Sequence, residues 1–216
     1  MLVKDLMAWP VISILDNATI GEAMDLLRRN NIKHLPVMDL HQTMVGVVSE
    51  TDLIKVFPNG RELSTFETNL LSRTPISKVM NAKVIAAVPD DPIELAALIM
   101  RTNRVSCLPV LDEKEKLIGL VTKNGIIDAF IAALGLREGG TRITIAFRRK
   151  WGFLSELITF ADKHNVCIDN IVTFDRELVI KIKGRDANFA KDLENAGYKV
   201  TDVSYIEPPQ AQPAAG

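Results

Sequence analysis

The stretch Gly46-Val47-Val48-Ser49-Glu50-Thr51-Asp52 recurs, with substitutions, as Gly119-Leu120-Val121-Thr122-Lys123-Asn124-Gly125. Each copy reads as a glycine, a short apolar strand and a hydroxyl residue that opens a helix. A strand that runs into a helix N-terminus exposes unpaired backbone N–H groups, which suit a phosphate. The first copy places an acid, Asp52, three residues after the hydroxyl, whereas the second has Gly125 there. This difference is the strongest functional signal in the sequence.

The two stretches belong to an internal duplication. Gly46 and Gly119 lie 73 positions apart (119 − 46). The same shift places Leu35-Pro36-Val37 on Leu108-Pro109-Val110. A register this long without a gap indicates two copies of one structural unit.

Each copy should contain a strand, a helix, two strands and a closing helix. Thr19 and Glu22 form a capping box at the first helix, and Asp91 is the expected N-cap of its counterpart, with Pro92 at the first helical position. Residues 57–60 should break the chain before a connecting helix at 62–72. The expected strands are 10–15, 35–38, 44–48, 108–111 and 117–121, and the expected closing helices are 51–56 and 124–134.

These features resemble a pair of CBS repeats, a Bateman module, which binds adenosine nucleotides in many regulatory proteins. The resemblance covers about residues 1–136 and rests on the glycine–strand–Ser/Thr-x-x-Asp ending and the upstream Leu-Pro-Val. It implies an α/β fold in which two repeats pack sheet to sheet as a pseudo-twofold pair and leave two related clefts. In that family the acid holds ribose hydroxyls, the hydroxyl residue lies near ribose or phosphate, and apolar residues flank adenine.

Carried onto this sequence, the resemblance implies a ligand such as AMP, ADP, ATP or S-adenosylmethionine, and no other cofactor or metal. In the cleft of the first repeat, Asp52 would hold the ribose, and Lys33 and His34 would face phosphate. The base would be walled by Val11, Ile12, Pro36 and Val37. The cleft of the second repeat, which has Gly125, should be weak or empty. The implied binding residues are Val11, Ile12, Lys33, His34, Pro36, Val37, Ser49, Thr51, Asp52, Arg101, Arg104 and Thr122.

Two alternatives stay open at this point. Ser49 and Asp52 also form an ordinary capping box, which needs no ligand to explain it. The repeat pair could then serve only as an oligomerisation scaffold. No metal-ligand spacing, nucleophile elbow or phosphate loop occurs, so an enzyme is not expected.

After a linker at 137–141, whose paired glycines permit a hinge, the pattern changes. Strands at 142–147, 167–174, 178–183 and 199–205 and helices at 153–164 and 186–196 give a βαββαβ order. This order, with a glycine at the first strand-to-helix turn, resembles a ferredoxin-like ACT domain, a regulatory module that often binds amino acids. The acid and proline that precede this glycine in the family are absent here. The implied effector residues are Trp151, Gly152, Phe153, Leu154, Asn170 and Ile171.

The whole therefore resembles a CBS–ACT regulatory protein of the acetoin-utilisation type, expected to be a cytoplasmic homodimer. A net charge of −1 gives no reason to expect nucleic acid or an anionic membrane as partner. Cys107 and Cys167 lie in apolar runs and should be buried thiols, whereas His41 and His164 should be solvated. The expected divisions are 1–72, first repeat with connecting segment; 73–136, second repeat; 137–141, linker; 142–207, ACT-like domain; and 208–216, disordered tail.

Overall fold

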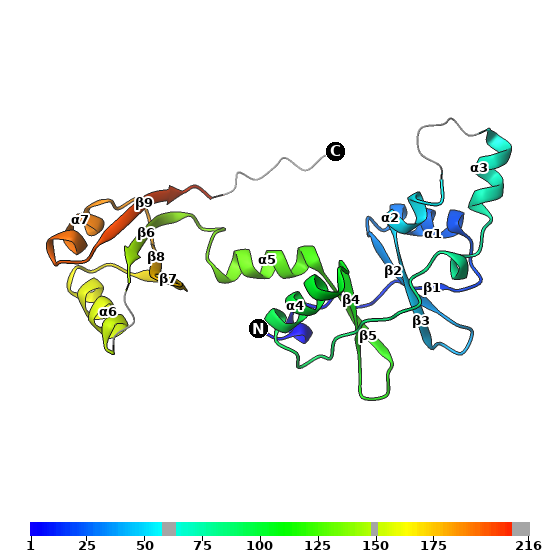
Figure 1. Cartoon of the computed structure of the whole chain (residues 1–216), viewed down its shortest axis with the longest axis horizontal. Helices are drawn as coiled ribbons and strands as arrows, with labels where there is room; N and C mark the ends of the chain where they lie inside the picture. Colours follow the sequence, from blue (N-terminus) through cyan, green and yellow to red (C-terminus); the bar gives the residue numbers. More distant parts are fainter. Residues whose placement is uncertain (58–63, 148–150, 209–216) are drawn as a thin grey trace. The chain divides into compact units, whose positions relative to one another are not determined.

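The duplication is visible in a computed structural model that describes residues 1–57, 64–147 and 151–208 (Figure 1). The chain divides into two units, Met1–Ile127 and Asp128–Gly216. Most of the expected chain break at 57–60, the basic residues 148–150 and almost all of the expected tail lie outside the described residues.

The first repeat has a three-stranded sheet in the order β1-β2-β3, where β1 pairs parallel and β3 antiparallel with β2. The expected capping box is confirmed, because the Glu22 carboxylate accepts from Thr19 N at 2.8 Å and the Thr19 hydroxyl accepts from Glu22 N at 3.3 Å. Only the end of the expected first strand pairs. The elements are β1 (Ile14–Leu15), α1 (Ile20–Arg29), β2 (His34–Met38), β3 (Met44–Ser49), α2 (Glu50–Ile54) and α3 (Thr65–Ser72).

The second repeat follows the same plan with α4 (Ile93–Asn103), β4 (Cys107–Leu111), β5 (Leu117–Thr122) and α5 (Lys123–Ala133). The predicted Asp91 cap is wrong. Pro92, in an extended conformation, is the N-cap, and the Asp91 carboxylate instead accepts from Val88 N at 2.9 Å. The proline tolerates this place because its missing N–H would be unpaired at a helix start.

The leading segment of each repeat packs on the other repeat. Ala8, after the short helix η1 (Val3–Asp5), bridges to Leu120 of the second repeat. Ile76, in η2 (Ile76–Lys78), is fully buried in the core of the first repeat, and Asn81 bridges to Val47. The residues that precede the first repeat therefore pack on the second, and the residues that precede the second pack on the first.

The repeated glycines explain how closely this exchange packs. A Cβ at Gly46 would lie 2.7 Å from Met80 Sδ, and a Cβ at Gly119 would collide with Met7. Since Met80 is also 73 positions after Met7, the two contacts are related by the same repeat shift. The glycine that opens each functional stretch thus makes room for the leading segment of the other repeat.

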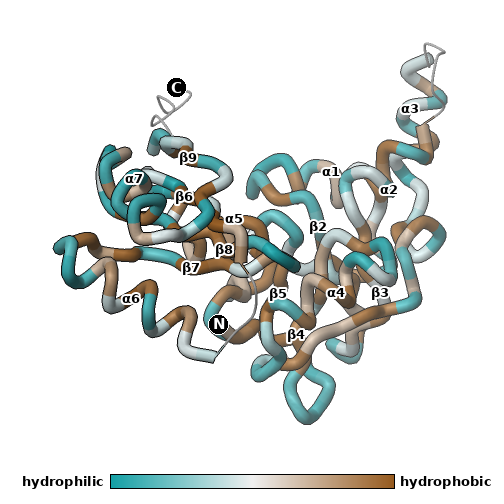
Figure 2. The backbone as a smooth tube through the Cα atoms, turned by 60° about the vertical axis from the view of Figure 1, so that its left-hand side comes forward, coloured by the Kyte–Doolittle hydropathy of each residue, from teal (hydrophilic) through white to brown (hydrophobic). Residues whose placement is uncertain are grey.

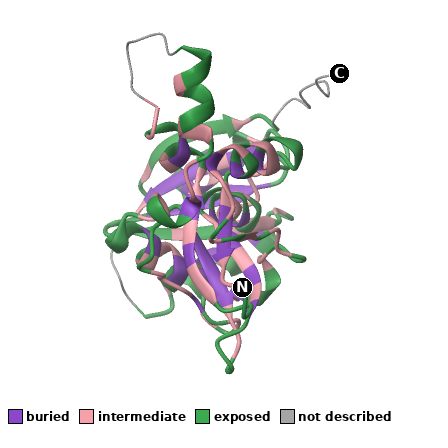
Figure 3. Cartoon of the chain, turned by 90° about the vertical axis from the view of Figure 1, so that its right-hand side faces the viewer, coloured by how far each residue is buried: buried purple, intermediate pink, exposed green. Residues whose placement is uncertain are grey.

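The core of the first repeat lies between α1 and the strands, whereas none of the described α3 residues is buried (Figure 3). The apolar face of α1 is buried at Ile20, Ala23 and Leu27. The strands contribute the fully buried Leu35, Val37 and Val48. Complete burial of such side chains contributes roughly 1.5–3 kcal/mol each, an upper estimate relative to an exposed chain.

The second unit has the expected βαββαβ order and an antiparallel sheet in the order β7-β8-β6-β9. Apolar residues of α6 alternate with polar ones along the helix (Figure 2), and both helices pack on Ile143 and Ile145 of β6 and on β8. The elements are β6 (Gly140–Ala146), α6 (Phe153–Lys163), β7 (Ile168–Phe174), β8 (Glu177–Ile182), α7 (Asn188–Asn195) and β9 (Val200–Ile206).

The expected glycine hinge is wrong in its second half. Gly140 begins β6 and pairs with Ile206. Both glycines have positive φ, 68° at Gly139 and 134° at Gly140, and a Cβ at Gly139 would lie 2.7 Å from Ile206 O. Glycine at this place allows the close approach of β9 and supplies a backbone conformation that other residues rarely adopt.

One side-chain expectation, the burial of Cys167, also needs correction. Cys107 is buried as expected, but Cys167 is exposed because it precedes β7 instead of lying inside it. His41 is exposed. His164 is exposed too, yet its Nδ1 lies 3.3 Å from Asp192 Oδ2, and its ring centroid lies 4.3 Å from that of Phe160.

Candidate functional site

Two cavities lie between the repeats, and each is lined by residues from both. We call the first the Asp52 cleft, with a volume of about 300 Å³. We call the second, of about 500 Å³, the Thr122 cleft. The Asp52 cleft is lined by His34, Val47, Ser49, Thr51, Asp52, Lys55, Asn81, Lys83, Ile85, Arg104, Val105, Ser106 and Cys107. The Thr122 cleft is lined by Ala8, Pro10, Val11, Ile12, Asn31, Ile32, Lys33, His34, Ser49, Glu50, Thr51, Ser106, Leu120, Thr122, Lys123 and Asn124.

The repeat shift of 73 relates the two clefts. It carries Ile12 to Ile85, Asn31 to Arg104 and Ser49 to Thr122. Each cleft therefore joins the helix-opening stretch of one repeat to the segment that leads into the first strand of the other. The exchange of leading segments produces this arrangement.

The grouping expected from the sequence differs from this geometry. Val11 and Ile12, expected beside Asp52, line the cleft that contains Thr122. The equivalent place beside Asp52 is taken by Ile85. The repeat shift would have indicated Ile85 as a candidate. Which apolar residues line which cleft could be assigned only from the structure, because the leading segments are exchanged between the repeats.

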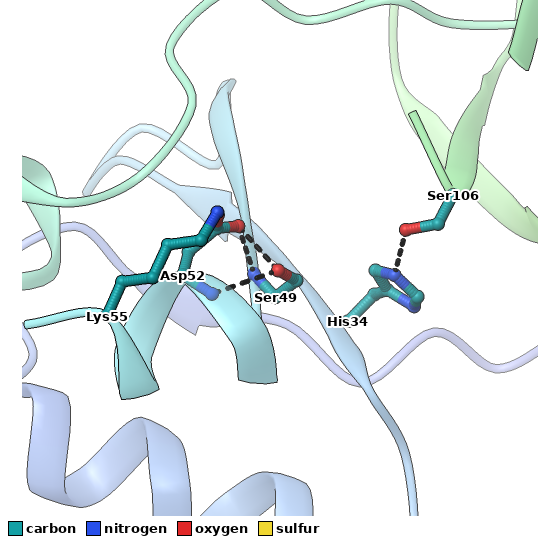
Figure 4. A network of polar contacts seen from close by, with 5 residues as sticks. All are labelled: His34, Ser49, Asp52, Lys55 and Ser106. Carbon is teal, nitrogen blue, oxygen red and sulfur yellow. Dashed lines mark hydrogen bonds and ion pairs between the residues drawn. The ribbon is translucent and has the colours of Figure 1, made fainter. Parts of the chain in front are cut away.

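Asp52 is held by the capping box that the sequence left as an alternative to ligand binding (Figure 4). Its Oδ2 accepts from Ser49 N at 3.1 Å and from Ser49 Oγ at 2.5 Å, while the Ser49 hydroxyl accepts from Asp52 N at 3.2 Å. The other oxygen, Oδ1, lies 4.0 Å from Lys55 Nζ. The carboxylate is partly exposed, so Oδ1 is the oxygen best placed to accept a further hydrogen bond.

The charges around Asp52 favour an anion. Lys55, Lys83 and Arg104 line this cleft together with the single carboxylate of Asp52. Three cations and one carboxylate leave an excess of positive charge, and His34 adds a group that can be protonated. A phosphate near these side chains would make charge-assisted hydrogen bonds, which are stronger than neutral ones.

The Thr122 cleft has the same hydroxyl but not the acid. Thr122 Oγ1 accepts from Gly125 N at 3.1 Å, which is half of a capping box. Lys33 and Lys123 line this cleft, and Glu50 is its carboxylate. The larger cavity therefore lacks a counterpart of Asp52 for a ribose diol.

His34 and Ser106 connect the two repeats where the clefts meet. His34 Nε2 lies 2.6 Å from Ser106 Oγ (Figure 4). Both residues line both clefts. Burial lowers the pKa of His34 from its ordinary value of 6.5; nearby Asp52 raises this pKa, and Lys33 lowers it further. The imidazole is therefore mainly neutral at pH 7.

Cys107 lines the Asp52 cleft but is not a reactive thiolate. Burial, with a smaller contribution from Asp52, raises the pKa of its thiol to about 12. The thiolate is the nucleophilic and metal-binding form of cysteine. Cys107 therefore contributes an apolar wall at neutral pH.

Three predicted binding residues lie outside both clefts. Pro36 and Val37 are buried in β2, where Val37 is fully enclosed in the core of the first repeat. Arg101 is exposed on α4 and lines neither cleft, unlike Arg104 three residues later. The apolar Leu-Pro-Val pattern that supports the repeat assignment thus serves the core at these two positions.

The sequence also missed side chains that do line the clefts. Lys55 lies one helical turn after Asp52, and Lys83 is carried by the leading segment of the second repeat. The i, i+3 spacing from Asp52 would have indicated Lys55. Lys83 had no such signal, because its counterpart 73 positions earlier is Pro10.

Of the six residues expected to bind an ACT effector, only Gly152 lines the hollow beside α6. Trp151 is fully exposed, whereas the Phe153 ring packs 4.7 Å from that of Phe147. The Asn170 side chain donates to the backbone oxygen of Asp169 at 3.0 Å. Leu154 and Ile171 are exposed, and Gly152 lines a shallow hollow of about 520 Å³ beside α6. The backbone at Gly152 has a φ of 81°, which explains glycine at this turn.

The described ranges, 1–57, 64–147 and 151–208, contain neither a candidate metal cluster nor a candidate membrane span. No three histidine, cysteine, aspartate or glutamate side chains in these ranges gather in a way that could hold a metal ion. None of the helices in the same ranges has both the length and the apolar character required to cross a membrane.

The fold and the two clefts define a class of tandem-repeat protein with a pair of cavities between the repeats. The family model for the CBS domain matches residues 3–59 and 76–132. The chain belongs to the CBS-domain family.

Comparison with curated relatives separates the repeat pair from larger proteins. The uncharacterized protein MJ1426 of Methanocaldococcus jannaschii is 32% identical over 61% of this chain and 92% of its own length. The L-aspartate semialdehyde sulfurtransferase of the same organism is 31% identical over 60% of this chain, but the match spans only 23% of that enzyme. The chain thus spans about a quarter of that relative.

Solved structures share the fold of the repeat pair. The CBS domain pair of MJ0100, in complex with 5′-methylthioadenosine and S-adenosyl-L-methionine, is 31% identical with a TM-score of 0.52 and covers 61% of this chain and 97% of its own. CBSX2 in complex with AMP is 25% identical with a TM-score of 0.50, covering 61% and 96%. A protein assigned to acetoin utilization (AcuB) from Vibrio cholerae is 26% identical with a TM-score of 0.52, covering 64% and 96%.

Proposed function

We propose that the chain is a regulatory protein that senses an adenosine nucleotide through the Asp52 cleft, and that it has no catalytic role. The observation that carries this proposal is the carboxylate of Asp52 in one cavity with Lys55, Lys83 and Arg104. An acid and a cationic wall are complementary to a ribose diol and a phosphate. The complexes of MJ0100 and CBSX2 support an adenosine compound as the ligand class.

Isothermal titration with AMP, ADP, ATP, S-adenosylmethionine and adenosine tests this proposal. We expect saturable binding of at least one phosphate-bearing compound, and weaker binding of adenosine because it lacks the charge that the cleft complements. The scaffold alternative predicts no heat from any of the five compounds.

Gly125→Asp should create or strengthen a second nucleotide site. A Cβ at this position would lie 3.4 Å from Thr122 Oγ1 and 4.0 Å from Leu6 Cγ, which are ordinary contacts. The new carboxylate would complete the capping box with Thr122 and supply the acceptor that the larger cleft lacks. Stoichiometry by calorimetry should rise from one AMP per chain toward two.

Gly125→Ala is the matched control, because it adds the Cβ without the carboxylate. The expectation for this control is the parent stoichiometry. A second site in Gly125→Ala, or none in a folded Gly125→Asp, would show that the missing acid is not what distinguishes the clefts.

We further propose that the chain forms a homodimer. Leu154 and Ile158, one turn apart on α6, are 43% and 46% exposed, and β7 and β9 are the edges of their sheet. Exposed apolar side chains and open strand edges both favour association. Light scattering at tens of micromolar, a range suited to ordinary association strengths, should give twice the chain mass of 23.9 kDa, and a single-chain mass would contradict the proposal.

We also propose that the second unit is an ACT-like domain that takes a small-molecule effector. Its strand and helix order supports this reading. If effector and nucleotide act on one equilibrium, each must change the affinity of the other by the same factor. AMP titrations with and without each of the twenty amino acids should reveal at least one such change. Unchanged AMP affinity throughout would leave this unit a role in association alone.

A further inference from the structure

His34 lies where the two clefts meet and lines both of them. It belongs to β2 of the first repeat, and its hydrogen-bond partner, Ser106, precedes β4 of the second. His34, Ser49, Thr51 and Ser106 line both cavities. A phosphate that enters either cavity therefore approaches the same imidazole.

At this junction His34 Nε2 and Ser106 Oγ are hydrogen-bonded to each other at 2.6 Å. A neutral imidazole has one donor and one acceptor nitrogen, whereas a protonated imidazole has two donors. The serine hydroxyl can donate to the neutral ring or accept from either form. A phosphate oxygen is only an acceptor, so it favours a ring that has a proton to donate on the nitrogen facing it.

Charged groups reach His34 from several elements. Asp52 on α2 is the carboxylate that acts on the imidazole directly, and Lys33 is its neighbour on the chain. The cations Lys55, Lys83 and Arg104 and the thiol of Cys107 share the Asp52 cleft with His34. Glu50 and Lys123 share the Thr122 cleft with it. In the free protein, burial outweighs Asp52 and lowers the pKa of the imidazole. An added phosphate changes this balance, because a nearby negative charge stabilises the protonated ring.

We propose that His34 makes anion binding by the repeat pair proton-linked: a ligand phosphate exchanges the Ser106 contact for its own, and the imidazole takes up a proton from solvent. No covalent bond changes in this step. The proposal rests on the proposed function, since it concerns the regulation of the same nucleotide site. It adds that pH, as well as nucleotide concentration, sets occupancy.

The sign of the pH dependence follows from this exchange. Because the complex binds more protons than the free protein, affinity for AMP should rise as pH falls from 7.5 to 6.0. One linked proton limits the increase to about tenfold per pH unit, and we expect roughly threefold or more per unit. The phosphate of AMP itself titrates near pH 6, so the measured quantity is the ratio of parent to variant affinity.

The experiment is calorimetry of AMP binding to the full chain at pH 7.0 and 6.0, in buffers of low and high ionisation enthalpy. His34→Gln keeps a polar side chain but cannot take up the proton. His41→Gln is the matched control, because His41 is an exposed histidine outside both clefts. We expect the parent and His41→Gln to show the same buffer-dependent heat and pH dependence of affinity, and His34→Gln to keep only the part of each that comes from the AMP phosphate.

A second measurement covers the case in which His34→Gln does not fold. The three histidine ring signals of the chain can be followed by NMR against pH, with His41→Gln and His164→Gln identifying His34 by elimination. Saturating AMP should shift the His34 titration to higher pH and leave that of His41 in place.

The outcomes separate the two proposals. AMP binding without proton uptake, or with an unmoved His34 titration, would overturn the proton linkage and leave the nucleotide site intact. No binding of AMP, ATP or S-adenosylmethionine would overturn both.

Discussion

Replacing Asp52 with alanine is expected to weaken AMP binding at least tenfold. A hydrogen bond to an ionised acceptor is worth about 1.5–3 kcal/mol, and tenfold in affinity corresponds to about 1.4 kcal/mol. The loss of a single ribose hydrogen bond would therefore reach this threshold. Titration calorimetry of the folded variant measures the change directly.

The capping box complicates this variant, and the structure supplies a control. Asp52→Ala also removes the acceptor of the Ser49 N–H, a loss that typically costs about 1 kcal/mol of stability. Glu22→Ala removes the equivalent acid of the Thr19 box, which lies outside both clefts. Both variants should lose similar stability, but only Asp52→Ala should lose affinity. Equal affinity of folded Asp52→Ala and parent would mean that the box acid has no ligand role.

A second large effect is expected in the other unit, at a buried ion pair. Lys181 Nζ lies 3.0 Å from Asp169 Oδ2, with side chains only 4% and 14% exposed. Removing one partner of such a pair leaves an uncompensated buried charge, which typically costs 3–5 kcal/mol. Lys181→Met should therefore lower the unfolding free energy of this unit by about that amount. Hydrogen exchange of the β6 and β8 amides reports on it without requiring the whole chain to unfold in one step.

An exposed pair of the same unit serves as the control. Arg185 and Glu207 are 3.5 Å apart with side chains 70% and 75% exposed, so Glu207→Gln should change stability by less than about 1 kcal/mol. The double variant of Lys181→Met and Asp169→Leu should recover part of the loss, since it removes both charges together. Similar protection in the parent and Lys181→Met would show that the Asp169 carboxylate, 14% exposed, finds enough water to be stable without Lys181.

Local rules predicted the features that depend on a few neighbouring residues. The capping boxes at Thr19 and Ser49 follow from side chains three positions apart, and the structure confirms both. The repeat period of 73 residues predicted two equivalent units from the sequence alone. The predicted N-cap of α4, Asp91, was wrong. Pro92 takes that place because a proline, which has no N–H, can start a helix without a side-chain cap.

The composition of the clefts could be predicted only in part. His34, Ser49 and Asp52 do share a cavity, because they lie on adjacent elements of one repeat. The apolar walls were assigned to the wrong cleft because the leading segments are exchanged between repeats. Such an exchange depends on long-range packing at Gly46 and Gly119, which repeat periodicity alone does not reveal.

The same dependence on tertiary packing explains why the predictions for Val37 and Gly140 were wrong. Val37 carries the pattern of a binding strand, but its side chain faces the core and is fully buried. The Gly139-Gly140 pair has the composition of a hinge, yet its positive φ angles serve the close contact with β9. Composition gives the conformations a residue can adopt, and tertiary packing selects among them.

Binding of an adenosine nucleotide in the Asp52 cleft can be located residue by residue. NMR with backbone amides assigned can follow the full chain during titration with AMP. We expect saturable shifts concentrated at Ser49, Asp52 and Ile85. In folded Asp52→Ala the same titration should need at least tenfold more AMP. The contradicting result is unchanged amides around Asp52 at saturating AMP, or shifts confined to residues outside both clefts.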